Sequence, residues 1–324
     1  MPKLLEDFES AIAPLCQRPT SARCLKTGAG YAYAKLVKEG EPAELSCRPA
    51  HAMIVGEKLE GHKRALADIR KAETVPEGGI HIGVAGFVNL GYIAANRSSG
   101  AILMDSNPVQ KVFWDIIIDM LSVYETKEDF ILALPSVPFQ LVAALDKLNC
   151  GQEYILLDED LSYDAPLETV RHKGRILFET GEDQGQMDLF GMRTDEDYTH
   201  LHKLAKVGAI AALTLDLKDA QGFNQLKTAM EEFKKASGCQ ERQIYVSSFY
   251  VSNVLEFLHN RRDFNGVENM PNARNMVLRN IASLLSAFFP KAADKGPMLI
   301  TYDRTYNPLQ LDGVSQRQLH MAMK

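Results

Sequence analysis

The sequence predicts an α/β protein with a doubly wound, mostly parallel sheet. The first observation is the region 80–107, where "IHIGVAG" is a short β-branched run ending in glycines, "NLGYIAAN" has the pattern of a short helix, and "GAILMDSN" is a second apolar run. The second is that this alternation returns at 208, where "GAIAALTLDLKD" precedes the amphipathic stretch "AQGFNQLKTAMEEFKKASG". Strands that alternate with helices are typical of parallel sheets with crossover helices.

The N-terminal residues 1–75 are expected to form a helical segment. Apolar side chains recur there at helical spacing in "LLEDFESAIAPL", and the stretch 39–73 predicts more helix around a Pro/Gly break. The turn sequence "VPEGG" at 75–79 marks a plausible boundary. The role of this N-terminal segment is left open: it could be a lid, a dimer arm or a packing element.

Residues 76–324 are expected to form one Rossmann-like domain with an insertion. "PVQKVFWDIIIDMLSVY" predicts a helix with Pro108 in its first turn. About 125–205 the sequence is mixed, polar and rich in glycine, which indicates a helical and irregular insertion or cap over the sheet. "RQIYVSSFYVSNV" is β-rich, "VLEFLHNRR" is helical, and "MVLRNIASLLSAFF" and "PMLITYDRTY" supply further elements.

Composition excludes several classes of protein. The net charge is −6 over 324 residues and no long basic block occurs, which disfavours nucleic-acid binding. The five cysteines are odd in number and lack C-x-x-C spacing, which disfavours a zinc site and favours reduced thiols. Acidic residues interrupt the N-terminus where a signal peptide needs an apolar core, and no apolar run approaches the roughly 20 residues of a membrane span. We therefore expect a cytoplasmic protein that binds no membrane.

Gly83, Gly86 and Asp105 form the first candidate site. In doubly wound sheets a glycine turn after the first strand lets a ligand approach, and an acid about 20 residues later accepts hydrogen bonds from ribose. Asp105 follows Gly86 by nineteen residues. The strict G-x-G-x-x-G is absent because Phe87 and Val88 follow Gly86, so S-adenosylmethionine, which has no diphosphate, fits better than a dinucleotide. From spacing alone, a turn glycine and a helix-capping acid explain the pattern equally well.

Asp216 and Asp219 form the second candidate. They follow an apolar run and precede a helix. Asp216 is placed to contact an adenine amino group from the third strand tip, whereas Asp219 is the expected N-cap of the following helix. Paired carboxylates also suggest a metal, but no histidine lies close in the sequence, so no metal site is predicted.

Ser252 and Asn253 lie where a strand becomes a helix, a place where function gathers in α/β folds. Asn253 could orient a substrate amine or the methyl donor, although Ser and Asn also favour helix caps. Tyr250 could line a pocket, but packing explains it better. His200 and His202 point about 200° apart on a helix and are expected to be structural or surface residues.

Several stretches resemble a bacterial family of uncharacterised class I, Rossmann-like S-adenosylmethionine methyltransferase-like proteins. "GVAGFVNLGYIAANRSSGAILMDSN" is similar to the family's "GVGPEQN-x-x-YIA … A-x-x-x-D", and "DYTHLHKLAKVGAIAALTLDLKDAQGFNQL" is similar to a later helix and strand. "FYVSNVLEFL" with "FNGVENMP" is the most specific part. The similarity spans roughly residues 80–290. It differs at Gly86-Phe87-Val88, where the family has Pro-Glu-Gln, and at Asn107, Pro108 and Leu215.

The resemblance implies S-adenosylmethionine as cofactor, and the residues that match the family are Asn89, Tyr92, Asp105, Asp216, Ser252 and Asn253. In a methyltransferase site the candidate residues have the following expected roles. Asp105 would hold the ribose, Asp216 would lie near the adenine, and Gly83 and Gly86 would admit the methionine portion. Asn89 or Asn253 would position that portion. The candidate cofactor-binding residues are Gly83, Gly86, Asn89, Asp105 and Asp216, and the candidate substrate-binding residues are Tyr92, Tyr250, Ser252 and Asn253. No catalytic residue is assigned, because methyl transfer needs mostly proximity and alignment.

The leading hypothesis is an S-adenosylmethionine-dependent methyltransferase that acts on a small molecule, with a homodimer as a compatible assembly. The alternative is a non-catalytic binding or regulatory protein that retains the fold, which the altered loop at 86–88 favours. A dehydrogenase is a weaker third hypothesis, because the third glycine of the dinucleotide motif is missing.

Overall fold

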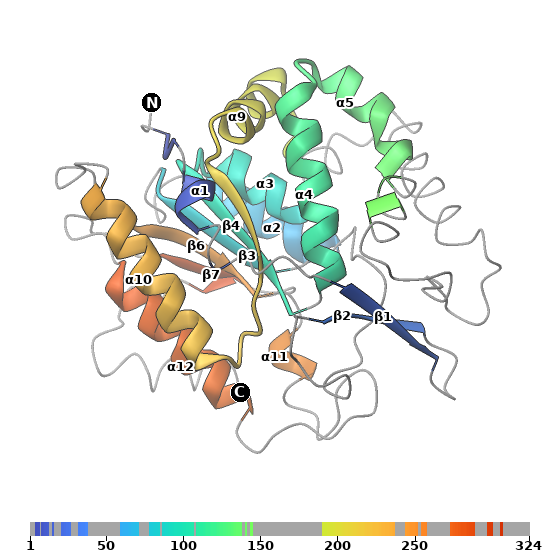
Figure 1. Ribbon diagram of the computed structural model, residues 1–324. Helices are drawn as coiled ribbons and strands as arrows, with labels where there is room; N and C mark the ends of the chain where they lie inside the picture. Colours follow the sequence, from blue (N-terminus) through green and yellow to red (C-terminus); the bar gives the residue numbers. More distant parts are fainter. Residues whose placement is uncertain are drawn as a thin grey trace.

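The computed structural model describes residues 4–6, 8–12, 15, 21–26, 32–37, 59–70, 78–84, 86–106, 108–137, 140, 143–144, 190–236, 244–251, 254–257, 273–288, 297–300 and 305–306. A six-stranded sheet lies at the centre, with helices packed on it (Figure 1). Its strands are β3 (Ile80–Val84), β4 (Gly100–Asp105), β5 (Ile210–Thr214), β6 (Val246–Tyr250), β7 (Met298–Ile300) and β8 (Thr305–Tyr306).

The order in which strands are added to the sheet changes direction in the middle of the sheet, between β3 and β6. The order is β5-β4-β3-β6-β7-β8, in which the first five strands are parallel and β8 runs antiparallel to β7. From β3 the chain moves outward through β4 to β5, and then crosses back to β6 on the other side of β3. Ligands of open α/β sheets bind outside the carboxyl ends of strands at such a reversal. The predicted α/β class with a mostly parallel sheet is confirmed.

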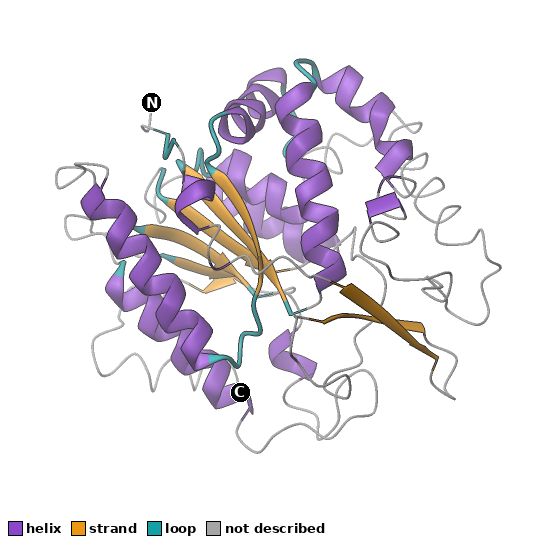
Figure 2. Ribbon diagram, viewed as in Figure 1, coloured by secondary structure: helices purple, strands orange, loops and turns teal. Residues whose placement is uncertain are grey.

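Helices cover both faces of the sheet, as a doubly wound arrangement requires (Figure 2). One face carries α2 (Leu59–Arg70), α3 (Val88–Ala95), α4 (Pro108–Val123) and α9 (Asp195–Lys206). The other face carries α1 (Phe8–Ile12), α10 (Ala220–Ala236) and α12 (Ala273–Ala287). The remaining helices are α5 (Lys127–Ala133), η2 (Leu134–Ser136) and α11 (Val254–Phe257).

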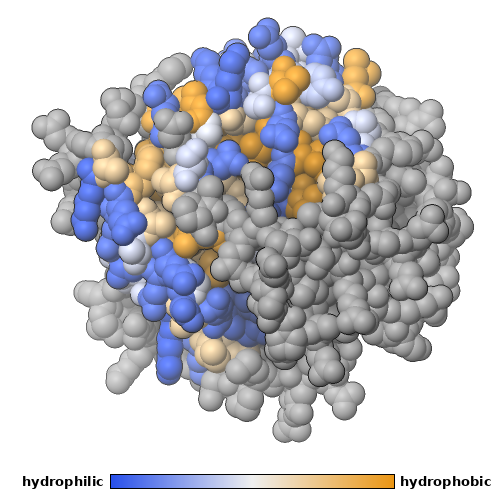
Figure 3. Space-filling view, in the orientation of Figure 1, coloured by the Kyte–Doolittle hydropathy of each residue, from blue (hydrophilic) through white to orange (hydrophobic). Residues whose placement is uncertain are grey.

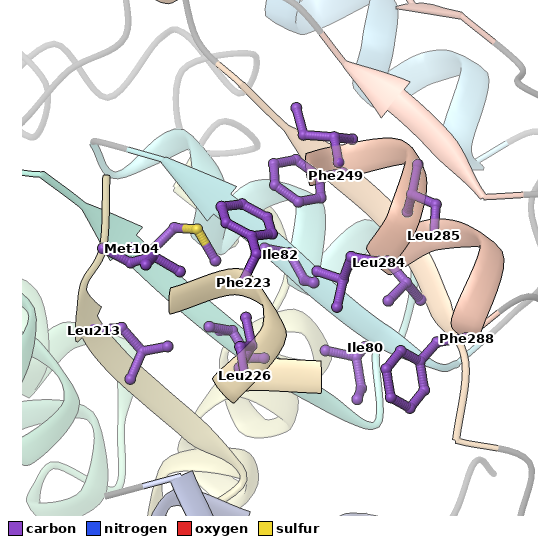
Figure 4. Packing of buried hydrophobic residues seen from close by; sticks show 14 of the residues in the cluster. Ile80, Ile82, Met104, Leu213, Phe223, Leu226, Phe249, Leu284, Leu285 and Phe288 are labelled. Atoms are coloured by element: carbon purple, nitrogen blue, oxygen red, sulfur yellow. The ribbon is translucent and has the colours of Figure 1, made fainter. Parts of the chain in front are cut away.

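The core between the sheet and α10 and α12 follows from the alternation of side chains along β3. Ile80 and Ile82 point to this face, where they meet Phe223 and Leu226 from α10 (Figure 4). All four side chains are buried, so they remove large apolar areas from water, which is the main stabilising term in such a core. The opposite side of α10 is polar, and Figure 3 shows hydrophilic residues along the surface where this helix runs.

The expectation of a helical segment over 1–75 is wrong in part. β1 (Ser21–Lys26) and β2 (Ala32–Val37) pair antiparallel within it. The sequence "SARCLKTGAGYAYAKLV" has a glycine-containing turn between two short runs, which is the pattern of a hairpin rather than of a helix. Phe8 and Ile12 of helix α1 are buried in the core beside α10. The N-terminal residues therefore contribute to the same core as the central sheet.

The predicted insertion at about 125–205 extends too far toward the C-terminus. Its last part is α9, which packs against α3 and α4 and leads directly into β5. Tyr198, Leu201 and Leu204 of α9 are buried, so this helix belongs to a layer of the fold and is not a cap. Most of 138–189 lies outside the described residues. Within the described part of the chain, no helix has both the length and the apolar character needed to cross a bilayer.

Candidate functional site

The carboxyl ends of β3, β4, β5 and β6 meet at one edge of the sheet. Asp105, the last residue of β4, stands opposite Thr214 of β5 in the strand register. The Leu215 backbone N–H donates to the Asp105 carbonyl at 2.9 Å, so the pairing continues one residue past β5. This bond holds Asp105 beside the loop that follows β5. The Thr214 hydroxyl oxygen is buried and meets no hydrogen-bond partner among the residues that the structure describes.

Asp216 and Asp219 have different surroundings in that loop. Asp216 Oδ1 accepts from the Lys218 backbone N–H at 2.9 Å, and the Lys218 ammonium lies 3.6 Å from its other oxygen. The Asp216 side chain stays about a quarter exposed, at 26%. Asp219 Oδ1 accepts from the N–H groups of Gln221 and Gly222, both at 3.0 Å. Asp219 therefore caps α10, as predicted, and Asp216 is the acid of this pair nearer to the strand tip.

Asn89 lies inside the protein, beneath the turn between β3 and α3. Its side chain is fully buried, and its amide nitrogen donates to the carbonyls of Val84 at 3.2 Å and Gly86 at 2.8 Å. Its Oδ1 lies 3.0 Å from His81 Nε2. The structure thus places Asn89 as a support for the turn, and not as a surface group that faces a ligand.

Gly83 has a packing reason to be glycine. A Cβ atom built on it would collide with Asn89 Oδ1 and would lie 2.8 Å from His81 Nε2. The space that a side chain would need is therefore filled by Asn89, and Gly83 does not open the edge to a ligand directly. Gly86 is buried in the turn itself. Phe87, the next residue, packs against the rings of Phe113, Trp114 and Phe190.

His81 is a buried, neutral histidine that links β6 to Asn89. Its Nδ1 lies 2.8 Å from Ser248 Oγ. Because Asn89 Oδ1 can only accept, His81 Nε2 carries the proton, and Nδ1 then accepts from the Ser248 hydroxyl. Burial lowers the pKa of His81 to about 4, against the opposing effect of its hydrogen bond with Asn89. The imidazole is therefore uncharged at neutral pH.

A β-bulge in β6 brings Ser248 and Tyr250 to the face where His81 lies. Ile80 pairs with Val246 but His81 pairs with Ser248, so one extra residue, Ser247, enters β6 at this point. Such an insertion changes which face the following side chains occupy. After it, Ser248 stands opposite His81 and Tyr250 stands opposite Gly83.

Tyr92 and Tyr250, predicted to contact a substrate, come together with His62 of α2. The two tyrosine rings lie 5.4 Å apart, and His62 Nδ1 and the Tyr92 hydroxyl are joined by a 2.7 Å hydrogen bond. All three side chains are buried. Burial, followed by the nearby Tyr250, raises the pKa of Tyr92 well above its usual value. Helix α2 thus covers both tyrosines, which are buried between α2 and the neighbouring strands β3 and β6.

The remaining predicted residues have simpler outcomes. Ser252 and Asn253 lie outside the described residues. His200 Nε2 donates to the Ser98 carbonyl at 2.9 Å and His202 Nδ1 donates to the Leu121 carbonyl at 2.8 Å, so both have structural roles, as expected. No group of three potential metal-ligating side chains occurs among the residues for which the structure gives positions.

His62, His81 and Ser248 were not anticipated from the sequence. One signal was present for His81, because it is a polar residue inside the apolar run "IHIGV", two positions before a glycine. A histidine in a buried strand needs hydrogen-bond partners, and the glycine leaves space for one. Nothing local connects His62 or Ser248 to this cluster, because both reach it through tertiary packing.

The fold and this edge define an α/β protein with a mostly parallel sheet that carries two partly exposed acidic residues, Asp105 at the end of β4 and Asp216 just after β5. Residues 63–309 match the domain of unknown function DUF7790. The match covers most of the chain, and the chain belongs to this family. The matched region starts within α2 and ends beyond β8, so it contains the whole six-stranded sheet. Among curated proteins, none matches the chain.

Proposed function

We propose that the protein is an S-adenosylmethionine-dependent methyltransferase, of the Rossmann-like class I type, that acts on a small molecule in the cytoplasm. The observation that supports it is the position of Asp105. It ends β4, beside the turn that leaves β3, where the strand order reverses. A carboxylate at this place can accept hydrogen bonds from both hydroxyls of a ribose.

The donors of the cofactor match the acceptors at the edge. The ribose hydroxyls and the adenine amino group are hydrogen-bond donors, and Asp105 and Asp216 offer partly exposed carboxylates at neighbouring strand tips. The buried hydroxyl of Thr214, which stands opposite Asp105 in the strand register, is a further polar group without a partner in the described region. Asp105 would hold the ribose, Asp216 would face the adenine, and the turn at Gly86 would border the methionine portion.

When bound, S-adenosylmethionine supplies an electrophilic methyl group on its sulfonium. The work left to the chain is to bind both reactants and align them, because methyl transfer gains most from proximity and orientation. Tyr92 and Tyr250 are buried beneath α2, so they do not offer a surface for contact with the acceptor. Exposed residues of the neighbouring loops would then select the acceptor.

A non-catalytic ligand-binding protein is the second candidate. The family that the sequence resembles has a glutamate where Phe87 stands here, and Phe87 is held in an aromatic cluster away from any polar role. The turn therefore lacks a carboxylate that could assist an acceptor. This observation favours binding of the cofactor without transfer.

Calorimetric titration with S-adenosylmethionine and with S-adenosylhomocysteine tests the cofactor site. We expect micromolar binding to the parent and at least tenfold weaker binding to Asp105→Ala. Asp119→Ala is a matched control, because Asp119 is exposed on α4 and far along that helix from Asp105. No binding to the parent would overturn the cofactor assignment, and equal binding to Asp105→Ala would overturn the role of Asp105.

Transfer is then tested with methyl-labelled S-adenosylmethionine and a fractionated mixture of small metabolites. Label that moves into a small molecule supports the methyltransferase. Binding without any transfer would support the non-catalytic candidate instead.

A further inference from the structure

A directed series of four hydrogen bonds runs from β6 to the turn between β3 and α3. It begins at the Ser248 hydroxyl, passes through the His81 imidazole, and reaches the Asn89 amide. From Asn89 it ends on the backbone carbonyls of Val84 and Gly86. Ser248, His81 and Asn89 are fully buried, so each of these bonds is shielded from water.

The donor and the acceptor of each hydrogen bond in this series can be assigned in only one way. The Asn89 amide nitrogen faces two carbonyls, which can only accept, so Asn89 Oδ1 must be the atom that faces His81. His81 then donates from Nε2 and accepts at Nδ1, and Ser248 is the donor at the start. Every member donates toward the turn, and hydrogen bonds aligned in this way polarise one another.

Two backbone features allow these side chains to meet. Because Gly83 has no side chain, Asn89 can occupy the space next to His81. The bulge at Ser247 supplies the other end, since it aligns Ser248 with His81. Two separate features of the fold, the glycine in β3 and the bulge in β6, thus make this series of hydrogen bonds possible.

We propose that His81, Asn89 and Ser248 are positioning residues that fix the β3–α3 turn in its ligand-binding conformation. They draw the carbonyl oxygens of Val84 and Gly86 toward the protein interior. A ligand carboxylate, such as that of the methionine portion, is then not repelled by those oxygens at the edge. A turn that is already ordered also loses less conformational freedom when the ligand binds.

The identity of the ligand in this proposal rests on the proposed function, but the ordering of the turn does not. Trp114, the one tryptophan of the chain, reports on the turn without any ligand. Its ring centroid lies 6.1 Å from that of Phe87, the residue that follows Gly86. A change in the turn should therefore alter the fluorescence of Trp114.

The central experiment compares Asn89→Asp with Asn280→Asp. The first variant keeps an acceptor for His81 but replaces the donor to the two carbonyls with a repelling oxygen. Asn280 offers the same substitution on α12, where its amide nitrogen donates to the Leu217 carbonyl at 2.9 Å and is also buried. We expect Asn89→Asp to shift Trp114 emission, to speed amide exchange at residues 86–90, and to weaken S-adenosylmethionine binding at least tenfold. Asn280→Asp should change neither the Trp114 emission nor the amide exchange at residues 86–90.

A double-mutant cycle keeps the proposal testable if Asn89→Asp does not fold. Gly83→Ala should displace the Asn89 side chain and weaken binding at least tenfold in the parent. In an Asn89→Ala background the same change should weaken binding less than it does in the parent, because the Asn89 side chain is gone and only the 2.8 Å approach to His81 Nε2 remains. Conservative rescue adds a third readout, since His81→Gln retains a donor for Asn89 and should bind more tightly than His81→Leu.

The outcomes separate the two proposals. If the parent binds no S-adenosylmethionine but the Trp114 and exchange effects occur in Asn89→Asp, the positioning role stands and the proposed function fails. If Asn89→Asp folds with unchanged emission, exchange and affinity, the positioning role is overturned. Additive effects of Gly83→Ala and Asn89→Ala would overturn it as well.

Discussion

Arg97 holds the carboxylate of Asp197 at 3.0 Å while its own backbone is left-handed, with a φ of 50°. Asp197 is 1% exposed, and Arg70 of α2 lies 3.2 Å from its other oxygen. The contact therefore joins α2, the connection between α3 and β4, and the first turn of α9. A buried carboxylate between two guanidinium groups is costly to disturb, because removing one charge leaves the others uncompensated.

Asp197→Asn should destabilise the protein by about 2 kcal/mol, at the low end for a broken buried ion pair because both arginines are partly exposed. Urea unfolding followed by circular dichroism measures this. Asp195→Asn is the control, since Asp195 is on the same helix and pairs with Lys127 at 2.7 Å but is 81% exposed. Its cost should be below about 1 kcal/mol. Equal costs would contradict the assigned role of Asp197.

Arg97→Gly should be more stable than Arg97→Ala, by about 1 kcal/mol. Both variants lose the ion pair with Asp197, but only glycine adopts a positive φ without a steric penalty. The order is opposite to that expected at most positions, where alanine is the more stable of the two. Thermal and urea unfolding of the two variants, side by side, decide it. A more stable alanine variant would argue against the left-handed conformation at Arg97.

Stability should fall as the pH falls from about 6.5 toward 4. The pKa of His81 is about 4 in the folded protein, because of burial, against about 6.5 in an unfolded chain. In that window the unfolded chain binds the extra proton, so acid favours unfolding, by about 2 kcal/mol between pH 7 and pH 5 for this one group. Above pH 6.5 the contribution is fully present.

Comparing His81→Gln with the parent isolates the histidine. The variant should show a shallower fall in unfolding free energy between pH 7 and pH 5. Burial also lowers the pKa of His200 to about 4, so part of the slope should remain in the variant. An unchanged slope in His81→Gln would show that His81 does not titrate as proposed.

Tyr92→Phe should act on stability and leave ligand affinity nearly unchanged. The hydroxyl is buried and bonded to His62, so its loss leaves a buried polar atom of His62 without that bond, at a cost of roughly 1–3 kcal/mol. A double-mutant cycle with His62→Phe should give a coupling energy of about 1 kcal/mol. A large loss of S-adenosylmethionine affinity in Tyr92→Phe would instead return this residue to the ligand-binding surface.

Asp216→Ala and Asp219→Ala should separate binding from stability. Asp219 caps α10 through two backbone N–H groups, so its loss should cost about 1 kcal/mol of stability with little effect on ligand binding. Asp216→Ala should weaken S-adenosylmethionine binding several-fold. Unfolding curves and calorimetric titrations of the two variants provide the comparison, and exchanged phenotypes would refute the assignment.

The class of fold was predictable from the sequence because its signals are local. The alternation of β-branched runs with amphipathic stretches indicated β3, α3, β4 and α10. The cap at Asp219 was also predictable, since a helix N-terminus is satisfied by a side chain two or three residues away. Asp105 was recognised as the end of an apolar run. These features depend on neighbours in the chain, and their energetic reasons lie within a few residues.

The orientation of the polar residues depended on tertiary structure. Asn89 looked like a ligand contact in the sequence, but the fold turns its amide inward, to His81 and the carbonyls beneath the turn. His81 and Ser248 are 167 residues apart in the chain and meet because β3 and β6 are neighbours and a bulge sets their register. Local sequence determines which segments become strands, whereas strand order and register determine which buried polar groups must satisfy one another, because an unsatisfied group in the core costs more than any local preference supplies.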